Sequence, residues 1–181
     1  MIVMNNKTIN MVARKKLVQD IGSTFDILVK EISKFSGESI NKVPFDDSWT
    51  AGQATEHIRI CGRGIPDNKT TEADRPYDEK VAAIKALFLN YDMKFKTDPS
   101  IAPGPPPHNR GALLQNMKET KEHLKTVAKT TDLEALCKDM ELPTFGYLTR
   151  YEWLRFILFH TERHVHQIRN IYAKILEGSI L

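Results

Sequence analysis

The chain has 181 residues, with 26 Lys and Arg against 23 Asp and Glu, which gives a net charge of +3 at pH 7. This length suits one domain, over residues 1–181, with a substantial buried core. The small net charge and the mixing of basic with acidic residues disfavour a nucleic-acid partner. No apolar run approaches the roughly 18 residues that span a bilayer, so we expect no membrane partner.

The cysteines and the N-terminal segment bear on the compartment. Cys61 and Cys137 lie far apart in the sequence and form no Cys-x-x-Cys pattern, so two reduced thiols are expected. The first residues contain no charged segment leading into an apolar one, as a secretory signal would. Both observations favour a cytoplasmic protein.

The first predicted helix covers residues 8–36, because apolar residues recur there at steps of three and four. Gly37 is its predicted stop. A second helix is predicted to begin after Thr50, since Thr50 and Gln53 have the spacing of a capping box, and to end near residues 62–64. The apolar set of the first helix is Met11, Val12, Leu17, Val18, Ile21, Phe25, Leu28, Ile32 and Phe35.

The middle of the chain alternates loops and helices. Residues 66–76 are polar and predict a loop, and a shorter helix is expected over residues 78–93. Five prolines and one glycine over residues 99–107 predict an extended linker without helix, which could border a pocket. Asn109 is the predicted N-cap of a long helix that ends near residue 129. Residues 132–137 are expected to add one more helical turn.

The last helix is predicted to begin at Arg150, because Thr149 and Glu152 repeat the capping-box spacing, and to end before Gly178. No segment has the strict alternation of a sheet strand. Four long helices, one additional short helix and a proline-rich loop therefore predict an all-α protein built as a four-helix bundle.

Two histidines on the last helix point to a metal. His160 and His164 lie one turn apart on a mostly apolar stripe, whereas His166 lies roughly 160° around the helix from His160 and is expected to point elsewhere. Two imidazoles at this spacing can offer two nitrogens to one divalent ion. The Glu that follows the first histidine of the metalloprotease motif is missing, so peptidase chemistry is not expected.

A catalytic metal usually has three protein ligands, and His57 is the best third candidate because it lies on an inward face of the second helix. On spacing alone, a three-histidine site and three core histidines satisfied by hydrogen bonds are equally supported. Cys61, one turn after His57, could add a fourth, soft ligand, although a small buried cysteine needs no function. His108 and His123 are expected to be solvated.

Two segments of the chain, Ser48-Trp-Thr-Ala-Gly-Gln-Ala-Thr-Glu-His57 and Phe159-His-Thr-Glu-Arg-His-Val-His-Gln-Ile168, resemble the DinB/YfiT-like superfamily. The resemblance extends over nearly the whole chain. It implies a four-helix bundle in which one His on the second helix and a His-x-x-x-His pair on the last helix hold a divalent metal. In this sequence those ligands are His57, His160 and His164.

Characterised relatives in this family include thiol transferases and isomerases that use low-molecular-weight thiols. The resemblance therefore implies thiol-dependent transfer to a small electrophilic substrate, and a homodimer is also plausible for this family. Metal-dependent hydrolysis, or a non-catalytic metal-binding or stress-response interaction module, are the alternatives. The proline-rich insertion at residues 99–107 departs from the ordinary family pattern, so the substrate cannot be carried over.

A metal held by three neutral imidazoles keeps its double charge and lowers the pKa of a bound thiol or water. Zinc or nickel is expected first, with iron, copper or manganese as alternatives, because imidazole suits several of these ions. Arg150, Arg155 and Arg163 could bind a carboxylate-bearing thiol, or form the solvated face of the last helix. The candidates for supporting the ligands or contacting a substrate are Gln167, Gln53, Trp49 and Trp153, with core packing favoured for both tryptophans.

Overall fold

The computed structural model describes residues 9–178, so the predicted start of the first helix at Thr8 and the N-terminal segment before it lie outside the described residues. The helices are α1 (Met11–Ser33), α2 (Ala51–Cys61), α3 (Val81–Phe88), α4 (Arg110–Thr130) and α5 (Arg150–Glu177), with short 3-10 turns η1 (Ser39–Asn41) and η2 (Pro99–Ile101). The strands are β1 (Thr70–Thr71) and β2 (Leu136–Cys137).

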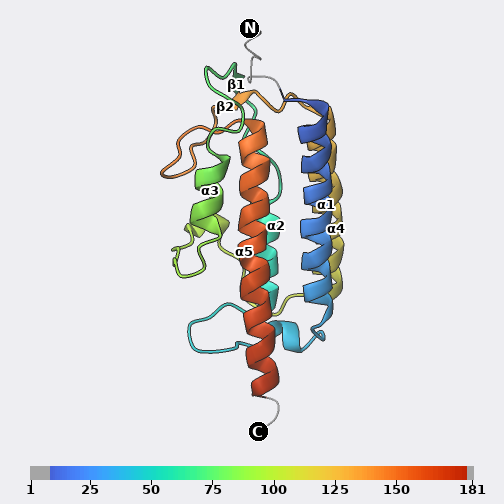
Figure 1. Ribbon diagram of the computed structural model, residues 1–181. Helices are drawn as coiled ribbons and strands as arrows, with labels where there is room; N and C mark the ends of the chain where they lie inside the picture. The colour runs from blue at the N-terminus through green and yellow to red at the C-terminus, as the bar shows by residue number, and fades with distance from the viewer. Residues whose placement is uncertain (1–8, 179–181) are drawn as a thin grey trace.

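Four of the helices form the predicted bundle (Figure 1). Helix α1 packs against α4 and α5, and α2 packs against the same two helices, so the order around the bundle is α1–α4–α2–α5. Helix α3 lies outside this ring and packs against α5. The predicted four-helix bundle with one additional short helix is confirmed. Over residues 9–178, no helix has both the length and the apolar content that crossing a membrane requires.

The apolar stripe of α1 explains its place in the core. Its five fully buried side chains follow one another at steps of four, four, three and four residues, which keeps them on one face. Burying each side chain of this kind contributes roughly 1.5–3 kcal/mol to folding. Met11 and Val12 were predicted to belong to this face, but they are 81% and 77% exposed, because they lie about 80° and 180° around the helix from the stripe. The buried five are Leu17, Ile21, Phe25, Leu28 and Ile32.

The predicted helix starts are confirmed by their caps. Thr50 and Gln53 form the capping box of α2 through two side chain–backbone hydrogen bonds of 3.1 Å. Thr149 and Glu152 form the same motif at α5, and the Asn109 side chain caps α4. Each box satisfies backbone N–H groups that the helix leaves without partners. The caps therefore fix where α2 and α5, the two histidine-bearing helices, begin.

Four predictions about the bounds or the type of an element were wrong. Helix α1 ends at Ser33, before Gly37, because the Lys34 N–H already bonds to the carbonyls of the last turn. The short helix α3 covers eight residues, less than the predicted 78–93. Residues 132–137 contain no helical turn; β2 pairs there with β1 in an antiparallel register, Thr70 opposite Cys137. The proline-rich segment contains the 3-10 turn η2.

A buried ion pair holds the loop before α3 against the start of α5. The Glu152 side chain has no exposed surface and accepts two hydrogen bonds of 2.7 Å from Arg75. The Lys80 N–H donates to the same carboxylate at 2.8 Å. Burial alone lowers the pKa of Arg75, but its bonds to Glu152 outweigh burial and raise that pKa. The carboxylate thus acts both as helix cap and as anchor for the loop.

Two other contacts tie the bundle helices to one another. Glu31 of α1 lies 2.5 Å from Lys34 Nζ and 3.1 Å from Arg169 Nε of α5. Burial raises the pKa of Glu31, but these two cations outweigh it and leave the pKa below its ordinary 4.5. At the end of α2, a methyl group on Gly62 would lie 2.9 Å from Thr120 Cγ2 of α4. That glycine therefore permits the close approach of α2 and α4.

Candidate metal centre

The structure brings His57, His160 and His164 together. His57 Nε2 lies 3.1 Å from His160 Nε2, and His164 Nε2 lies 3.1 Å from the same atom. His57 comes from α2 and the other two come from successive turns of α5, as their spacing predicts. His57 and His160 are 3% and 8% exposed. The Nε2 atoms of His57 and His164, which come from two neighbouring helices, therefore both lie beside His160 Nε2.

Hydrogen bonds orient two of the three rings. His57 Nδ1 lies 2.8 Å from the carbonyl oxygen of Ile101, and His164 Nδ1 lies 2.7 Å from Gln167 Oε1. Both oxygens can only accept, so in each ring Nδ1 carries the proton and Nε2 has a free lone pair. Such bonds to the outer nitrogen are the usual way in which proteins orient a metal-binding imidazole.

The surroundings keep these imidazoles neutral. Burial lowers the pKa of His57, and it lowers that of His164 to about 4. Burial also lowers the pKa of His160 well below its ordinary value, and the neighbouring histidines and Arg163 lower it further. Neutral imidazole is the form that binds a metal ion. The site is therefore in its ligand form at neutral pH.

These residues fit a divalent cation. Metal–nitrogen bonds of about 2.05 Å at tetrahedral angles place two ligand nitrogens about 3.3 Å apart, close to the 3.1 Å separations of the Nε2 atoms. If His160 Nε2 carried a proton, that proton could form a good hydrogen bond to the Nε2 lone pair of either His57 or His164, but not to both. His160 Nδ1 is buried without a hydrogen-bond partner, so no contact of the outer nitrogen selects that protonated form. A shared cation would satisfy all three nitrogens at once.

Cys61 lies beside the His57 ring, with its Sγ 3.7 Å from Nε2 and 3.9 Å from Nδ1. One candidate ligand atom of each of His57, Cys61 and His160 lies within 4.8 Å of the other two. Burial raises the pKa of the Cys61 thiol to about 11, so without a cation nearby the sulfur stays protonated. Both cysteines are free thiols, as predicted.

The four supporting residues predicted from the sequence fall in different places. Gln167 contacts His164, and the half-buried Trp49 ring stacks on His164 with centroids 6.4 Å apart. Gln53 forms the α2 cap and donates to the Gly104 carbonyl at 3.3 Å, away from the Nε2 atoms. Trp153 lies in a separate apolar cluster between α3 and α5, with Ile84, Cys137, Leu142, Leu148 and Phe159. Trp153 is thus a core residue.

The proline-rich segment closes over α2. Glu56 accepts hydrogen bonds from the Gly104 N–H and from His108 Nε2, both at 2.8 Å. The bond from His108 is the main reason that the pKa of Glu56 is lowered. His108 was predicted to be solvated, but its side chain, held by this hydrogen bond, is only 10% exposed. His123 is exposed, as predicted.

Aromatic side chains that the sequence did not single out line the histidines. The rings of Phe88 and Phe156 lie 6.2 and 5.7 Å from the ring of His160. Phe156 lies one turn before His160 on α5, so its helical spacing could have predicted that it lies beside this histidine. Phe88 and the Ile101 carbonyl reach the site through tertiary packing, and no local pattern marks them. The surroundings of the histidines are therefore mostly apolar.

The arginines of α5 were assigned to its solvated face or to a substrate, and their protein partners correct the first of these roles. Arg150 and Arg155 pair with Asp67 and Asp20, each at 2.6 Å. Arg163 donates to backbone carbonyls in the segment after α3. Each guanidinium therefore fixes neighbouring elements onto α5.

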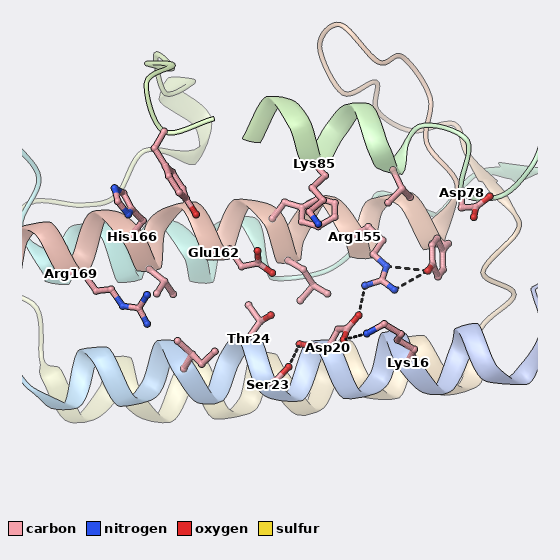
Figure 2. Close-up of a pocket in the computed structure, with 17 residues that line it drawn as sticks. Lys16, Asp20, Ser23, Thr24, Asp78, Lys85, Arg155, Glu162, His166 and Arg169 are labelled. Carbon is pink, nitrogen blue, oxygen red and sulfur yellow. Dashed lines mark hydrogen bonds and ion pairs between the residues drawn. The ribbon is translucent and has the colours of Figure 1, made fainter. Parts of the chain in front are cut away.

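A groove of about 660 Å³ lies on another face of α5, between α1 and α3 (Figure 2). Asp20 there lies between Arg155 and Lys16, and burial raises the pKa of Glu162. His166 lines this groove and stacks on Tyr91, so it points away from the other histidines of α5, as predicted. The described residues that line the groove include none of the three clustered histidines.

The comparisons with known proteins concern nearly the whole chain. The family model of the DinB superfamily matches residues 23–168. The uncharacterized protein YuaE of Bacillus subtilis is 21% identical over 146 residues, which cover 80% of this chain and 90% of YuaE. The structure of YfiT from Bacillus subtilis matches with a TM-score of 0.60 at 16% identity, over 93% of this chain and 91% of YfiT. YfiT is described as a probable metal-dependent hydrolase with an unusual four-helix bundle topology.

Proposed function

Because the chain belongs to the DinB superfamily, we propose that it is a divalent-metal-dependent enzyme whose metal is held by His57, His160 and His164. The observation that carries the proposal is that His57 Nε2 and His164 Nε2 each lie 3.1 Å from His160 Nε2. Core histidines satisfied by hydrogen bonds would direct N–H groups at acceptors. Here the Nε2 lone pairs of His57 and His164 both face His160 Nε2, which suits a shared cation. The Cys61 thiol, 3.7 Å from His57 Nε2, is another group that can donate to that lone pair.

The reaction that we propose is attack by a small thiol on an electrophilic substrate. A divalent metal in this site would supply positive charge that lowers the pKa of a bound thiol or water toward neutrality. The protein's own contribution is geometric: Ile101 and Gln167 keep the ring lone pairs directed at one point. Phe88, Phe156 and Trp49 surround that point with apolar surface, which strengthens electrostatic interactions within it.

Hydrolysis is the second candidate, since the same site could activate water in place of a thiol. It is supported by the likeness of the fold to that of YfiT, which is described as a probable metal-dependent hydrolase. The lack of an acidic side chain among the groups at the histidines in residues 9–178 favours the thiol reaction. Attack by water profits from a general base, whereas a metal-activated thiolate requires none.

The first test is metal content, measured by mass spectrometry on tag-free protein purified without added metal. The wild type is compared with a variant in which His57, His160 and His164 are all replaced by alanine, and circular dichroism checks that the variant folds. His123→Ala, at an exposed histidine, is the matched control. Near-stoichiometric metal in the wild type and the control, with none in the folded triple variant, supports the proposal. A wild type that stays empty after dialysis against zinc or nickel contradicts it.

The reaction itself is tested with the metal-loaded protein. Small thiols are screened with chlorodinitrobenzene-type and epoxide electrophiles, and activated esters are screened without thiol. Metal-dependent turnover that requires the thiol supports transfer, and metal-dependent ester cleavage without thiol supports hydrolysis. Full metal occupancy with neither activity would leave a metal-binding module.

A further inference from the structure

We propose that Glu56 is a positioning residue for the metal centre, because it holds the proline-rich segment against α2 so that the Ile101 carbonyl stays on His57. This inference rests on the proposed function, since His57 is one of the proposed ligands. The observation that carries it is that Glu56 Oε2 accepts the Gly104 N–H at 2.8 Å, three residues after the carbonyl that bonds to His57 Nδ1.

The sequence of this segment leaves few ways to hold its backbone. Residues 103–107 read Pro-Gly-Pro-Pro-Pro, so the Gly104 N–H is the one backbone donor in this stretch. That donor bonds to Glu56. Each proline fixes its φ at about −65°, which makes the stretch stiff. A displacement at Gly104 is therefore passed along the chain to the Ile101 carbonyl instead of being absorbed between them.

Helix α2 holds Gly104 at both of its backbone polar groups. Gln53 Nε2 donates to the Gly104 carbonyl at 3.3 Å, while Glu56 accepts from the Gly104 N–H. Glu56 comes directly before His57 in the same helix, so the segment is tied to the helix that carries the proposed ligand. The bond to Glu56 is the shorter of the two, and a bond to a carboxylate is the stronger kind.

The same carboxylate also holds the far end of the segment. His108 Nε2 donates to Glu56 Oε2 at 2.8 Å, and the His108 backbone exchanges two hydrogen bonds, of 2.7 and 3.0 Å, with the Asn41 side chain. A methyl group on Gly52 would lie 3.0 Å from His108 Cβ, so this side chain packs directly on α2. Removal of the Glu56 carboxylate therefore releases the segment at its middle and at one of the contacts of His108.

Loss of this anchor affects His57 through the proton on its ring. The Ile101 carbonyl keeps that proton on Nδ1 and leaves the Nε2 lone pair facing His160. Once the carbonyl can move away, the proton is free to occupy either nitrogen, and a ring protonated at Nε2 cannot bind a metal ion there. Glu56 thus acts on the metal centre only through Ile101 and His57.

Nuclear magnetic resonance of the full-length, metal-free protein tests this role without the metal. Long-range proton–nitrogen correlations show which ring nitrogen of each histidine carries the proton, and His57→Ala identifies the signals of His57. Glu56→Ala removes the acceptor, whereas Glu56→Gln keeps one side-chain oxygen for the Gly104 N–H. Glu122→Ala, at an exposed residue of α4, is the matched control. Should Glu56→Ala fail to fold, Glu56→Asp, which withdraws the carboxylate by one methylene group, takes its place with the same expectation.

The zinc affinity of the same proteins is measured by competition with a chromophoric chelator, and thermal unfolding checks that each is folded. We expect His57 to be protonated at Nδ1 in the wild type, in Glu56→Gln and in Glu122→Ala, and to be a mixture of both forms in Glu56→Ala. Zinc affinity should fall about tenfold in Glu56→Ala, the lower end of the effect of a lost partner of a ligating histidine, and stay within about twofold in the other two variants.

A folded Glu56→Ala with the proton position and zinc affinity of the wild type would overturn the inference. A Glu56→Gln that loses as much as Glu56→Ala would also overturn it, because the bond to Gly104 would then not be the cause. If no protein binds zinc, the wild type included, the proposed function fails, while the proton position on His57 still decides whether Glu56 keeps the Ile101 carbonyl in place.

Discussion

Replacement of Gln167 by leucine tests whether the orientation of His164 matters for metal binding. Gln167 is one turn beyond His164 on α5, and its Oε1 accepts the Nδ1 proton of His164 over 2.7 Å. Leucine has a similar volume but cannot accept that bond. The His164 ring is then free to rotate or to move its proton to Nε2, the nitrogen that faces His160.

The expected loss is in metal affinity. Removing a hydrogen-bond partner of a metal-ligating histidine typically lowers metal affinity about 10- to 100-fold. That range corresponds to about 1.4–2.7 kcal/mol of binding free energy. The effect should lie near the upper end, because the half-buried His164 has this one bonding partner for its Nδ1 among the described side chains. The His57 ring has a backbone partner, Ile101, which substitution leaves in place.

Competition with a chromophoric zinc chelator measures the affinity of each variant. His166→Gln is the matched control, because that histidine lies on the same helix but lines the groove on its other side, and it should bind zinc like the wild type. Thermal unfolding of the metal-free proteins separates a lost ligand orientation from lost stability. A Gln167→Leu affinity within about twofold of the wild type would refute this account of the bond.

Three further predictions concern stability. Arg75→Ala leaves the buried Glu152 carboxylate without its partner and should cost about 3–5 kcal/mol, measured by urea unfolding; a loss below 1 kcal/mol would contradict this. The pKa of Glu31 in the folded protein lies below 4.5. The wild type should therefore have a higher free energy of unfolding than Glu31→Gln, in full above that pH, and the difference should vanish as the pH falls through the folded pKa. A difference in unfolding free energy that is undiminished near pH 3 would contradict this. Gly62→Ala should cost about 1–3 kcal/mol in thermal unfolding by crowding α4, whereas Gly64→Ala, whose methyl would meet nothing closer than 3.9 Å, should be nearly neutral.

Sequence periodicity was sufficient to predict the helix bundle and to predict that the three histidines lie close together. Helix faces repeat every 3.6 residues, so a histidine among buried neighbours must point inward wherever the helix packs. His57, His160 and His164 were placed correctly for that reason. Their role as ligands stays a proposal, as do the homodimer and the cytoplasmic location.

The errors came from contacts between distant parts of the chain. The residues of β2 have no partner within their own segment and form a strand because Thr70 and Thr71 lie beside them. His108 is covered because its Nε2 donates a hydrogen bond to Glu56, 52 residues earlier in the chain. A helical wheel shows no partner for the arginines of α5, and only the folded chain brings carboxylates and carbonyls onto them. None of these partners leaves a local pattern.

The geometry further indicates that the site exists before any metal arrives. Both ligand-bearing helices begin at capping boxes, and α5 is held by the Arg75–Glu152 pair, none of which involves the clustered histidines. His57 and His164 are oriented by hydrogen bonds to Ile101 and Gln167. In proteins whose ligands come together only with the metal, binding free energy appears as folding free energy. Here the frame is independent of the ion, so metal should raise stability only by mass action, and the metal-free protein should remain a cooperatively folded bundle.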